Sequence, residues 1–479
     1  MHYYEVAPTK IVKADACVFT YSSQQPLAIG AVVIISIGQQ LLTGIVVKKT
    51  TKPDFATKEI TTILDLPPLP RPLLQTAQWM SNYYIAHLAL VLQTILPSGL
   101  TKKRRTLSPN STATTRRDRT HFVLNKDQSA AIGSLLNAKS GTVILHGVTG
   151  SGKTAVYIEY AKRLIATGKS VIVIVPEIAL TAQLIAEFQH SFPNLITTHS
   201  QQTEAQRHHA WLQALNATQP NVVIGPRSAL FMPFNNIGAI IIDEAHEPAL
   251  KQDQTPRYSA LRTAAILARY HHATVVQGSA TPLVSEYYLA AKTGRPIINL
   301  PARANPNIIT PSINVVDMTS KNGFLRHRFL SDLLINTINQ NLDNNKQTLI
   351  YHNRRGTAST TLCQNCGWSA LCPRCFIPMT LHADRHALIC HICGYRERVP
   401  TACPDCGSTD IVHKGIGTKL IESELQKLFP QAAIARFDGD ITSKNSLNQR
   451  YQELYDGHIN IIIGTQVVAK GLDLPRLAS

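Results

Sequence analysis

The chain has 479 residues, which at about 150 residues per domain predicts about three domains and excludes a single small module. Lys and Arg number 47 against 30 Asp and Glu, for a formal net charge of +17. Such an excess favours a polyanionic partner, nucleic acid before a membrane surface. With 44% hydrophobic and 16% charged residues, the sequence can build substantial cores and is too poor in charge for a disordered chain.

The sequence carries no obvious membrane or export signal. No apolar run approaches the ~20 residues that a membrane-spanning helix needs, and the longest lies around residues 28–37. The N-terminus begins Met1-His2-Tyr3 and lacks a basic segment followed by an apolar core. We therefore expect a cytoplasmic protein without a membrane partner.

The first segment, residues 1–98, consists of short β-rich runs, such as Ala31–Ile37, followed by an aromatic helical patch. This pattern predicts a small β-barrel-like domain with a helix, a shape often used to bind single strands. Trp79, Tyr83 and Tyr84 could stack on a base, but their helical spacing favours core packing.

A basic linker is predicted at residues 99–120, where apolar residues thin out and Lys102–Arg105 concentrates charge. It either contacts phosphates or is a solvated connector, and the sequence does not choose between these alternatives.

Two α/β lobes are predicted beyond the linker. In residues 121–300, apolar β-like runs alternate with helical segments, which is typical of a parallel sheet flanked by helices. Further strands predict a second lobe that begins at 301–361 and resumes at 410–479. The β-like runs are Thr142–Leu145, Val171–Val175, Asn221–Ile224, Ala239–Ile242, Thr274–Gln277, Thr348–Tyr351 and Ile461–Ile463.

A phosphate-binding loop is predicted in the first lobe, because residues 147–154 fit the pattern G-x-x-x-x-G-K-[ST] between an apolar run and a helical segment, Ala155–Ala166. In such loops the backbone N–H groups bind phosphate oxygens. Here Lys153 would neutralise the β- and γ-phosphates, and the Thr154 hydroxyl would bind Mg²⁺, so ATP with Mg²⁺ is the expected ligand. The loop residues are Gly147, Val148, Thr149, Gly150, Ser151, Gly152, Lys153 and Thr154.

Two adjacent carboxylates follow the apolar run that ends at Ile242. A carboxylate at the end of a buried strand can reach the magnesium, and a second one can polarise the attacking water. We assign the metal-side role to Asp243 and the catalytic base to Glu244, with Lys153 as the third catalytic residue.

Eight of the nine cysteines lie between Cys363 and Cys406, and Cys17 stands apart as a small apolar residue. Two C-x-x-C pairs supply one tetrahedral thiolate site, so four pairs predict two structural Zn²⁺ ions in an insert at 362–409. A disulfide cluster is disfavoured in a reducing cytosol. Spacing alone permits several pairings, and nearby histidines could replace a thiolate. The pairs are Cys363/Cys366, Cys372/Cys375, Cys390/Cys393 and Cys403/Cys406, and the histidines are His382, His386 and His391.

These motifs resemble the superfamily 2 helicases and, among them, the bacterial replication-restart helicases. The segment Leu124–Gln128 resembles the element before the phosphate loop, whose glutamine, here Gln128, contacts adenine. The cysteine-rich insert in the second lobe is the most specific point of resemblance. Other matching segments are Pro176–Gln183, His199-Ser200, Gly225–Phe231, Gly278–Pro282, Asn353–Gly356, Gly464–Gln466 and Lys470–Asp473.

The resemblance implies a fold of two RecA-like lobes, the second incomplete, and an ATP-dependent 3′–5′ DNA helicase. Such a protein recognises stalled or abandoned forks, holds a nascent 3′ DNA end in its N-terminal domain and initiates primosome assembly. Implied partners are forked and single-stranded DNA, other primosome proteins, the replicative helicase loader and single-stranded DNA-binding protein.

The resemblance also implies roles for particular residues. The outer cysteine pairs would share one zinc and the inner pairs the other. Arg227, Arg354 and Arg355 are candidates for contacts with DNA phosphates or with ATP, with solvated surface arginines as the alternative.

The sequence departs from this family at several positions. Residues 99–120 are too few for the usual winged-helix domain, Ala245 and Lys419 replace glutamates, and Pro226 replaces a threonine. The sequence ends at Ser479 without the arginine motif of the second lobe, and an arginine finger contributes ~10³ to 10⁵ in rate in related reactions. Weak hydrolysis is therefore expected. A truncated fork-binding scaffold is the alternative, and a DEAH-type RNA helicase is a third hypothesis that leaves the zinc insert unexplained.

Overall fold

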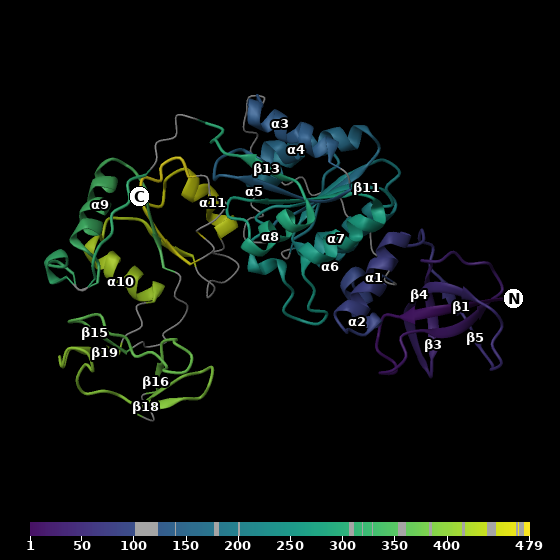
Figure 1. Cartoon of the computed structure of the whole chain (residues 1–479), viewed down its shortest axis with the longest axis horizontal. Coiled ribbons are helices and arrows are strands. Elements are labelled where there is room, and N and C mark those ends of the chain that lie inside the picture. Colours follow the sequence, from purple (N-terminus) through teal and green to yellow (C-terminus); the bar gives the residue numbers. More distant parts are fainter. Residues whose placement is uncertain are drawn as a thin grey trace. The chain divides into compact units, whose positions relative to one another are not determined.

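The computed structural model of the chain forms two compact units, Met1–Ile308 and Ile309–Ser479 (Figure 1). Each unit has its own sheets and hydrophobic clusters. Nearly all of the expected basic linker lies outside the described residues. The residues described are 1–100, 123–138, 140–176, 182–199, 202–305, 311–318, 320–327, 329–352, 361–382, 386–413, 417–437, 447–465, 468 and 474–479.

The N-terminal domain is built on a six-stranded, mainly antiparallel sheet in the order β5-β2-β1-β4-β3-β6. A two-residue turn at Gly38, whose φ of +59° suits glycine, joins β3 to β4. Alternate side chains of these strands are buried, which confirms the β-rich prediction. The strands are β1 (His2–Pro8), β2 (Phe19–Ser23), β3 (Val32–Ile37), β4 (Gln40–Thr50), β5 (Lys58–Glu59) and β6 (Thr62–Ile63).

Two helices follow this sheet where one was expected: α1 (Arg71–Tyr83) and α2 (Leu88–Ile95). Helix α1 packs against α7 (Ala260–His271) of the first lobe. One hydrophobic cluster runs from Met80 and Leu92 into the lobe, where it includes Tyr258. The N-terminal domain and the first lobe therefore share a core.

The first lobe is a seven-stranded sheet in the order β13-β7-β12-β11-β8-β10-β9, and all its pairings are parallel. The five predicted strands are confirmed, while the short edge strands β9 and β13 were not predicted. The strands are β7 (Gly141–Gly147), β8 (Ser170–Ile174), β9 (Ile196–Thr197), β10 (Val222–Gly225), β11 (Ile237–Ile242), β12 (Thr274–Ser279) and β13 (Ile297–Leu300).

Helices cover both faces of this sheet (Figure 1). Ile172 and Ile174 of β8 contribute to the cluster that holds α7, whereas Val171 and Val173 contribute to the cluster that holds α4. This alternation follows from the strand period of two and leaves β8 buried on both sides. The remaining helices are α3 (Lys126–Asn137), α4 (Lys153–Ala166), α5 (Ala182–Ser191), α6 (Glu204–Leu215) and α8 (Val284–Thr293).

The second unit contains a three-stranded parallel sheet in the order β14-β21-β20. Ile461 and Ile463 of β21 face one core cluster and Ile462 faces another, so this sheet too is covered on both faces. Strand β20 was not predicted. The elements are α9 (Asp332–Asp343), β14 (Thr348–Tyr351), α10 (Thr418–Leu428), β20 (Ile434–Phe437), α11 (Leu447–Tyr455) and β21 (Ile461–Gly464).

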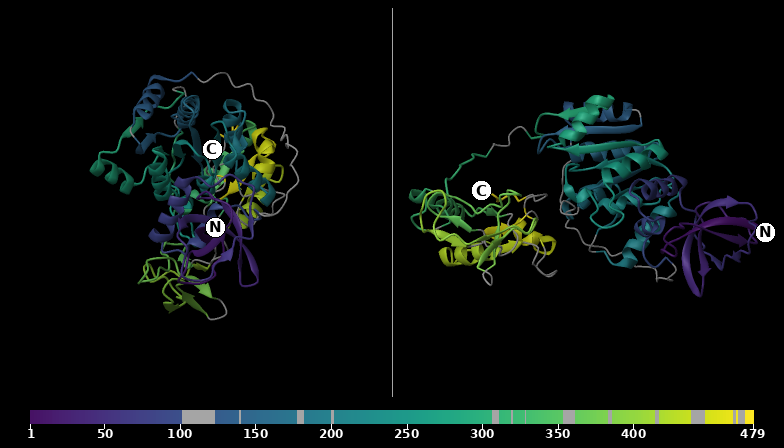
Figure 2. Two further views of the ribbon diagram at one scale, coloured as in Figure 1. Left: turned by 90° about the vertical axis from the view of Figure 1, so that its right-hand side faces the viewer. Right: turned by 60° about the horizontal axis from the view of Figure 1, so that its bottom comes forward.

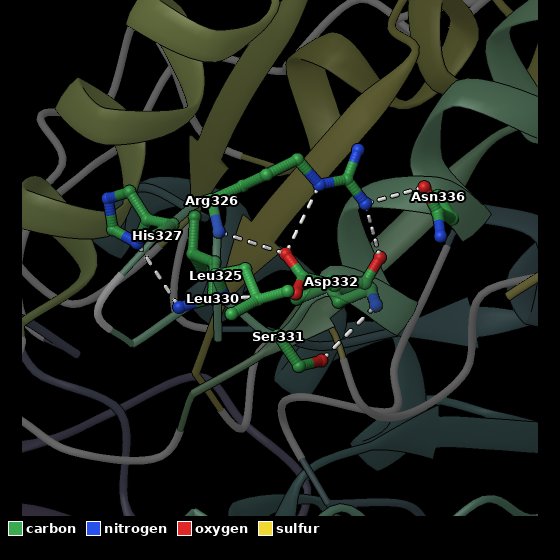
Figure 3. Close-up of polar contacts among 8 residues, drawn as sticks. Leu325, Arg326, His327, Leu330, Ser331, Asp332 and Asn336 are labelled. Atoms are coloured by element: carbon green, nitrogen blue, oxygen red, sulfur yellow. Dashed lines mark hydrogen bonds and ion pairs between the residues drawn. The ribbon is translucent and has the colours of Figure 1, made fainter. Parts of the chain in front are cut away.

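Helix α9 is anchored at its start by Asp332 (Figure 3). The carboxylate accepts the backbone N–H groups of Leu325 and Arg326 at 2.9 and 3.1 Å, and the Arg326 Nε at 3.1 Å. The Leu325 N–H, followed by the contacts of Arg326, lowers the pKa of Asp332. Ser331 caps the helix by accepting the N–H of Leu334. Hydrogen bonds therefore hold the segment that contains Leu325 and Arg326 against the start of α9.

The cysteine-rich insert forms two small antiparallel modules of the second unit, below α10 in Figure 1. Strand β15 (Thr361–Cys363) pairs with β19 (Ile411–His413), and a three-stranded sheet contains β16 (Thr380–His382), β17 (Ala387–Ile389) and β18 (Arg396–Arg398). The right-hand view of Figure 2 shows both units from another side. Among the residues described, no helix combines the length and apolarity needed to span a bilayer.

Candidate functional site

The predicted phosphate loop joins the end of β7 to the start of α4. Gly150 and Gly152 have φ of +77° and +76°, a left-handed conformation that favours glycine. At Gly147 a Cβ atom would lie 2.5 Å from Ser151 Oγ, so the turn has no room for a side chain there. The sequence folds this way because three glycines allow the backbone to wrap around the start of the helix.

The inner face of this loop fits a phosphate group. Lys153 Nζ donates to the carbonyl oxygen of Gly147 at 3.0 Å, which places the ammonium group over the loop. The Ser151 Oγ is buried and has no hydrogen-bond partner among the described residues. A donor set of this kind at the start of a 14-residue helix suits a polyphosphate, because the helix dipole and free N–H groups favour negative charge.

Gln128 braces the loop from α3. Its Oε1 accepts the N–H of Asn125 at 2.9 Å in a capping box, and its Nε2 donates to the Ser151 carbonyl oxygen at 3.0 Å. The side chain is 4% exposed. Its expected contact with adenine stays a prediction.

Asp243 lies at the end of β11, beside the phosphate loop. Its Oδ1 accepts a hydrogen bond from the Tyr157 hydroxyl at 2.9 Å. Burial, followed by the charge of Glu244, raises the pKa of Asp243 to about 6, and the Tyr157 hydrogen bond and the Lys153 charge oppose this rise. Burial and the nearby Asp243 raise the pKa of Tyr157 well above its ordinary value. No sequence motif pointed to Tyr157.

Glu244 has a φ of +45°, an uncommon conformation for a residue other than glycine. The following residue, Ala245, donates its N–H to the carbonyl oxygen of Gly278 at 2.9 Å, which holds the turn against β12. The Glu244 side chain is 31% exposed. This turn at the end of a buried strand exposes the Glu244 carboxylate to solvent. Such exposure is needed by a residue that activates a water molecule.

His246 connects this turn to the end of β12. Its Nδ1 lies 2.8 Å from Ser279 Oγ and 3.4 Å from a carboxylate oxygen of Glu244, and its Nε2 lies 3.4 Å from Glu247. The motifs 243–246 and 278–282, separated in the sequence, therefore share a polar network.

Of the three arginines predicted to contact DNA, Arg354 and Arg355 lie outside the described residues. Arg227 donates from one terminal nitrogen to the carbonyl oxygens of Ala249 and Lys251 at 2.8 and 2.7 Å. These bonds brace the loop that follows the carboxylate motif. A DNA contact of Arg227 stays a prediction.

The aromatic patch of α1 meets the first lobe. Trp79 and Tyr83 stack with ring centroids 4.7 Å apart, and the Tyr84 hydroxyl accepts the N–H of Ser259 at 3.0 Å. Trp79 and Tyr84 pack against the shared core, which confirms the packing interpretation for these two residues. Tyr83 remains 51% exposed.

The cysteines gather into two groups, and within each the four sulfurs lie within 4.8 Å of one another. Three Sγ–Sγ distances within these groups are 3.5 to 3.6 Å, far longer than the ~2.05 Å of a disulfide. They are close to the ~3.8 Å expected around a tetrahedral Zn²⁺ with ~2.3 Å bonds. The groups are Cys363, Cys366, Cys403 and Cys406, and Cys372, Cys375, Cys390 and Cys393.

Each C-x-x-C pair closes in the same way. The residue after the second cysteine donates its backbone N–H to the carbonyl oxygen of the first cysteine, at 2.8 to 3.1 Å. That residue has positive φ in all four turns: Gly367, Phe376, Gly394 and Gly407. Within the described residues neither sulfur group includes a histidine, and His382 and His391 instead face each other at 3.2 Å. Both groups thus offer four thiolates to a metal ion.

Known proteins resemble nearly the whole chain. The replication restart protein PriA of Rickettsia prowazekii is 34% identical over 461 residues, which cover 94% of this chain and 69% of the relative. The chain belongs to the PriA family. The PriA proteins of Bacillus subtilis and Haemophilus influenzae are each 38% identical, over 336 and 359 residues. The B. subtilis match covers 70% of this chain and 42% of the relative, and the H. influenzae match covers 74% and 48%. The chain therefore spans about half the length of these two relatives.

Family models match three parts of this PriA family member. The 3′ DNA-binding domain (3′BD) matches residues 13–97, the DEAD/DEAH box helicase matches residues 125–288, and the PriA DNA helicase Cys-rich region matches residues 372–398. The first two matches lie in the first unit and the third in the second unit. The fold of RecA-like lobes, N-terminal domain and cysteine insert is therefore the one that the sequence predicted.

Proposed function

We propose that this protein is an ATP-dependent DNA helicase that moves 3′ to 5′, acts on stalled or abandoned replication forks and starts primosome assembly there. The observation that carries the proposal is the meeting of Lys153, Tyr157 and Asp243 at one edge of the first sheet. It supports nucleotide binding next to a domain that matches a 3′ DNA-binding family.

The residues at this edge fit ATP with Mg²⁺. The ion, when bound, neutralises charge on the transferred phosphoryl group. Lys153 binds the β- and γ-phosphates, and Thr154 and Asp243 are the metal ligands. Glu244 is the base that orients and deprotonates the attacking water. Gln128 contacts adenine.

The DNA is bound, in this proposal, by several parts of the chain. Residues 1–98 hold the 3′ end, residues 99–120 are the basic linker, and lobes at 121–300 and at 301–361 with 410–479 step along one strand. Arg227, Arg354 and Arg355 contact phosphates. The net charge of +17 supports a polyanionic substrate.

The insert at 362–409 holds two structural Zn²⁺ ions, because eight thiolates fill two tetrahedral sites and leave no open position for water. We assign to it a part in duplex separation and the docking of other primosome proteins. The helicase loader and single-stranded DNA-binding protein are further proposed partners of the chain.

The test is strand separation on forked DNA, with 3′-tailed, 5′-tailed and RNA duplexes as comparisons. ATP-dependent unwinding of forked and 3′-tailed DNA is expected. Lys153→Ala should abolish it, while Lys162→Ala, an exposed lysine of the same helix, should not. Fork binding without unwinding would favour the scaffold alternative, and preferential unwinding of RNA would favour the RNA helicase.

A further inference from the structure

Tyr157 joins the phosphate loop to the proposed metal ligand. It lies on α4, one turn after Lys153, so the two side chains share a face of the helix. The side chain is 2% exposed. Its hydroxyl donates to Oδ1 of Asp243 at 2.9 Å, across a sequence separation of 86 residues.

Strand β12 makes room for this hydroxyl. A Cβ atom at Gly278 would lie 1.6 Å from the Tyr157 Oη and 2.8 Å from its Cζ. Gly278 lies within a strand and is absent from the positive-φ glycines, so its backbone conformation is open to other residues. The glycine is therefore explained by the space that the phenol ring occupies.

A neutral donor suits a carboxylate that must also bind a cation. The phenol fixes the orientation of the carboxylate through Oδ1 without cancelling its charge. Outer hydrogen-bond partners orient metal ligands in this way in many proteins. The tyrosine side chain turns about only two bonds and is enclosed by the core, so it fixes the position of Asp243 relative to the start of α4.

We propose that Tyr157 is a positioning residue, which orients Asp243 for the metal ion of the bound nucleotide. This inference deepens the proposed function and rests on it. In this proposal Gly278 leaves space for the Tyr157 ring. Helix α4 and strands β11 and β12 therefore set the position of the Asp243 carboxylate together.

The experiment measures Mn²⁺ binding by electron paramagnetic resonance, on the full chain saturated with a non-hydrolysable ATP analogue. Tyr157→Phe keeps the ring and removes the donor. We expect its Mn²⁺ dissociation constant to rise about tenfold or more, while the affinity for the analogue without metal stays within about twofold, because Lys153 and the loop remain intact. Gly278→Ala, which displaces the hydroxyl, should weaken Mn²⁺ binding in the same direction.

The matched control is Tyr160→Phe. Tyr160 lies on the same helix and is equally buried, but its hydroxyl is hydrogen-bonded to Thr274 and not to a carboxylate. If Tyr157→Phe binds Mn²⁺ as the wild type does, or if Tyr160→Phe weakens it equally, the positioning role is wrong while nucleotide binding stands. If the wild type retains no analogue at all, the proposed function itself fails.

Discussion

The contact between the N-terminal domain and the first lobe can be tested by truncating Met80. Its side chain is fully buried, and it belongs to the cluster that runs from α1 into the lobe. Methionine-to-alanine changes in a packed core cost ~2–5 kcal/mol, because transfer energy is lost and a cavity remains. We therefore expect Met80→Ala to destabilise the first unit by about 3 kcal/mol.

The assay combines thermal unfolding with hydrogen exchange. At roughly 2–4 °C per kcal/mol for a domain of 150–250 residues, the transition of the first unit should fall by several degrees. Amides of α7 should exchange faster although the mutation lies in α1, because the two helices pack together. Amides of β16 and β17 in the second unit should be unaffected.

The control is Gln75→Ala, an exposed position of α1 where the change should stay within about 0.5 kcal/mol. If Met80→Ala leaves the exchange of α7 unchanged, while the N-terminal sheet alone loses protection, the two parts do not share a core. The N-terminal domain and the first lobe would then be two separately stabilised domains.

Three further outcomes are expected. Tyr84→Phe should cost about 1 kcal/mol in chemical denaturation, since the Ser259 N–H loses its acceptor; an unchanged midpoint would contradict this. The folded pKa of Asp243, about 6, exceeds its ordinary 3.8, so folded protein keeps a proton that unfolded chain releases. Without nucleotide, stability should therefore fall as pH rises between these values, and Asp243→Asn should remove that part of the dependence. A chelator should release two Zn²⁺ per chain, whereas Cys372→Ser should leave one and Cys17→Ser two, by colorimetric zinc assay.

Short-range patterns made the two main sites predictable. The phosphate loop and the C-x-x-C turns are each built within a few residues, because both need a particular backbone turn and adjacent donors. The structure accordingly shows left-handed glycines at 150 and 152, and after three of the cysteine pairs. Strongly apolar central strands such as β8 and β11 were also predictable from the sequence.

Short edge elements were not predictable in the same way. Strands β9, β13 and β20 have two to four residues each, and β13 and β20 bury only some of their side chains. Such segments lack a sustained apolar run, and they become strands because a neighbouring strand offers them hydrogen bonds.

By itself, then, the sequence determined which groups can bind a phosphate or a metal ion, since these groups are close together along the chain. Only the tertiary structure decided which thiolates share a group, that the aromatic face of α1 meets α7, and that Tyr157 reaches Asp243 through the gap at Gly278. The physical reason is that these contacts join residues far apart along the chain, 175 positions in the case of Tyr84 and Ser259, and their geometry exists only once sheets and helices have packed.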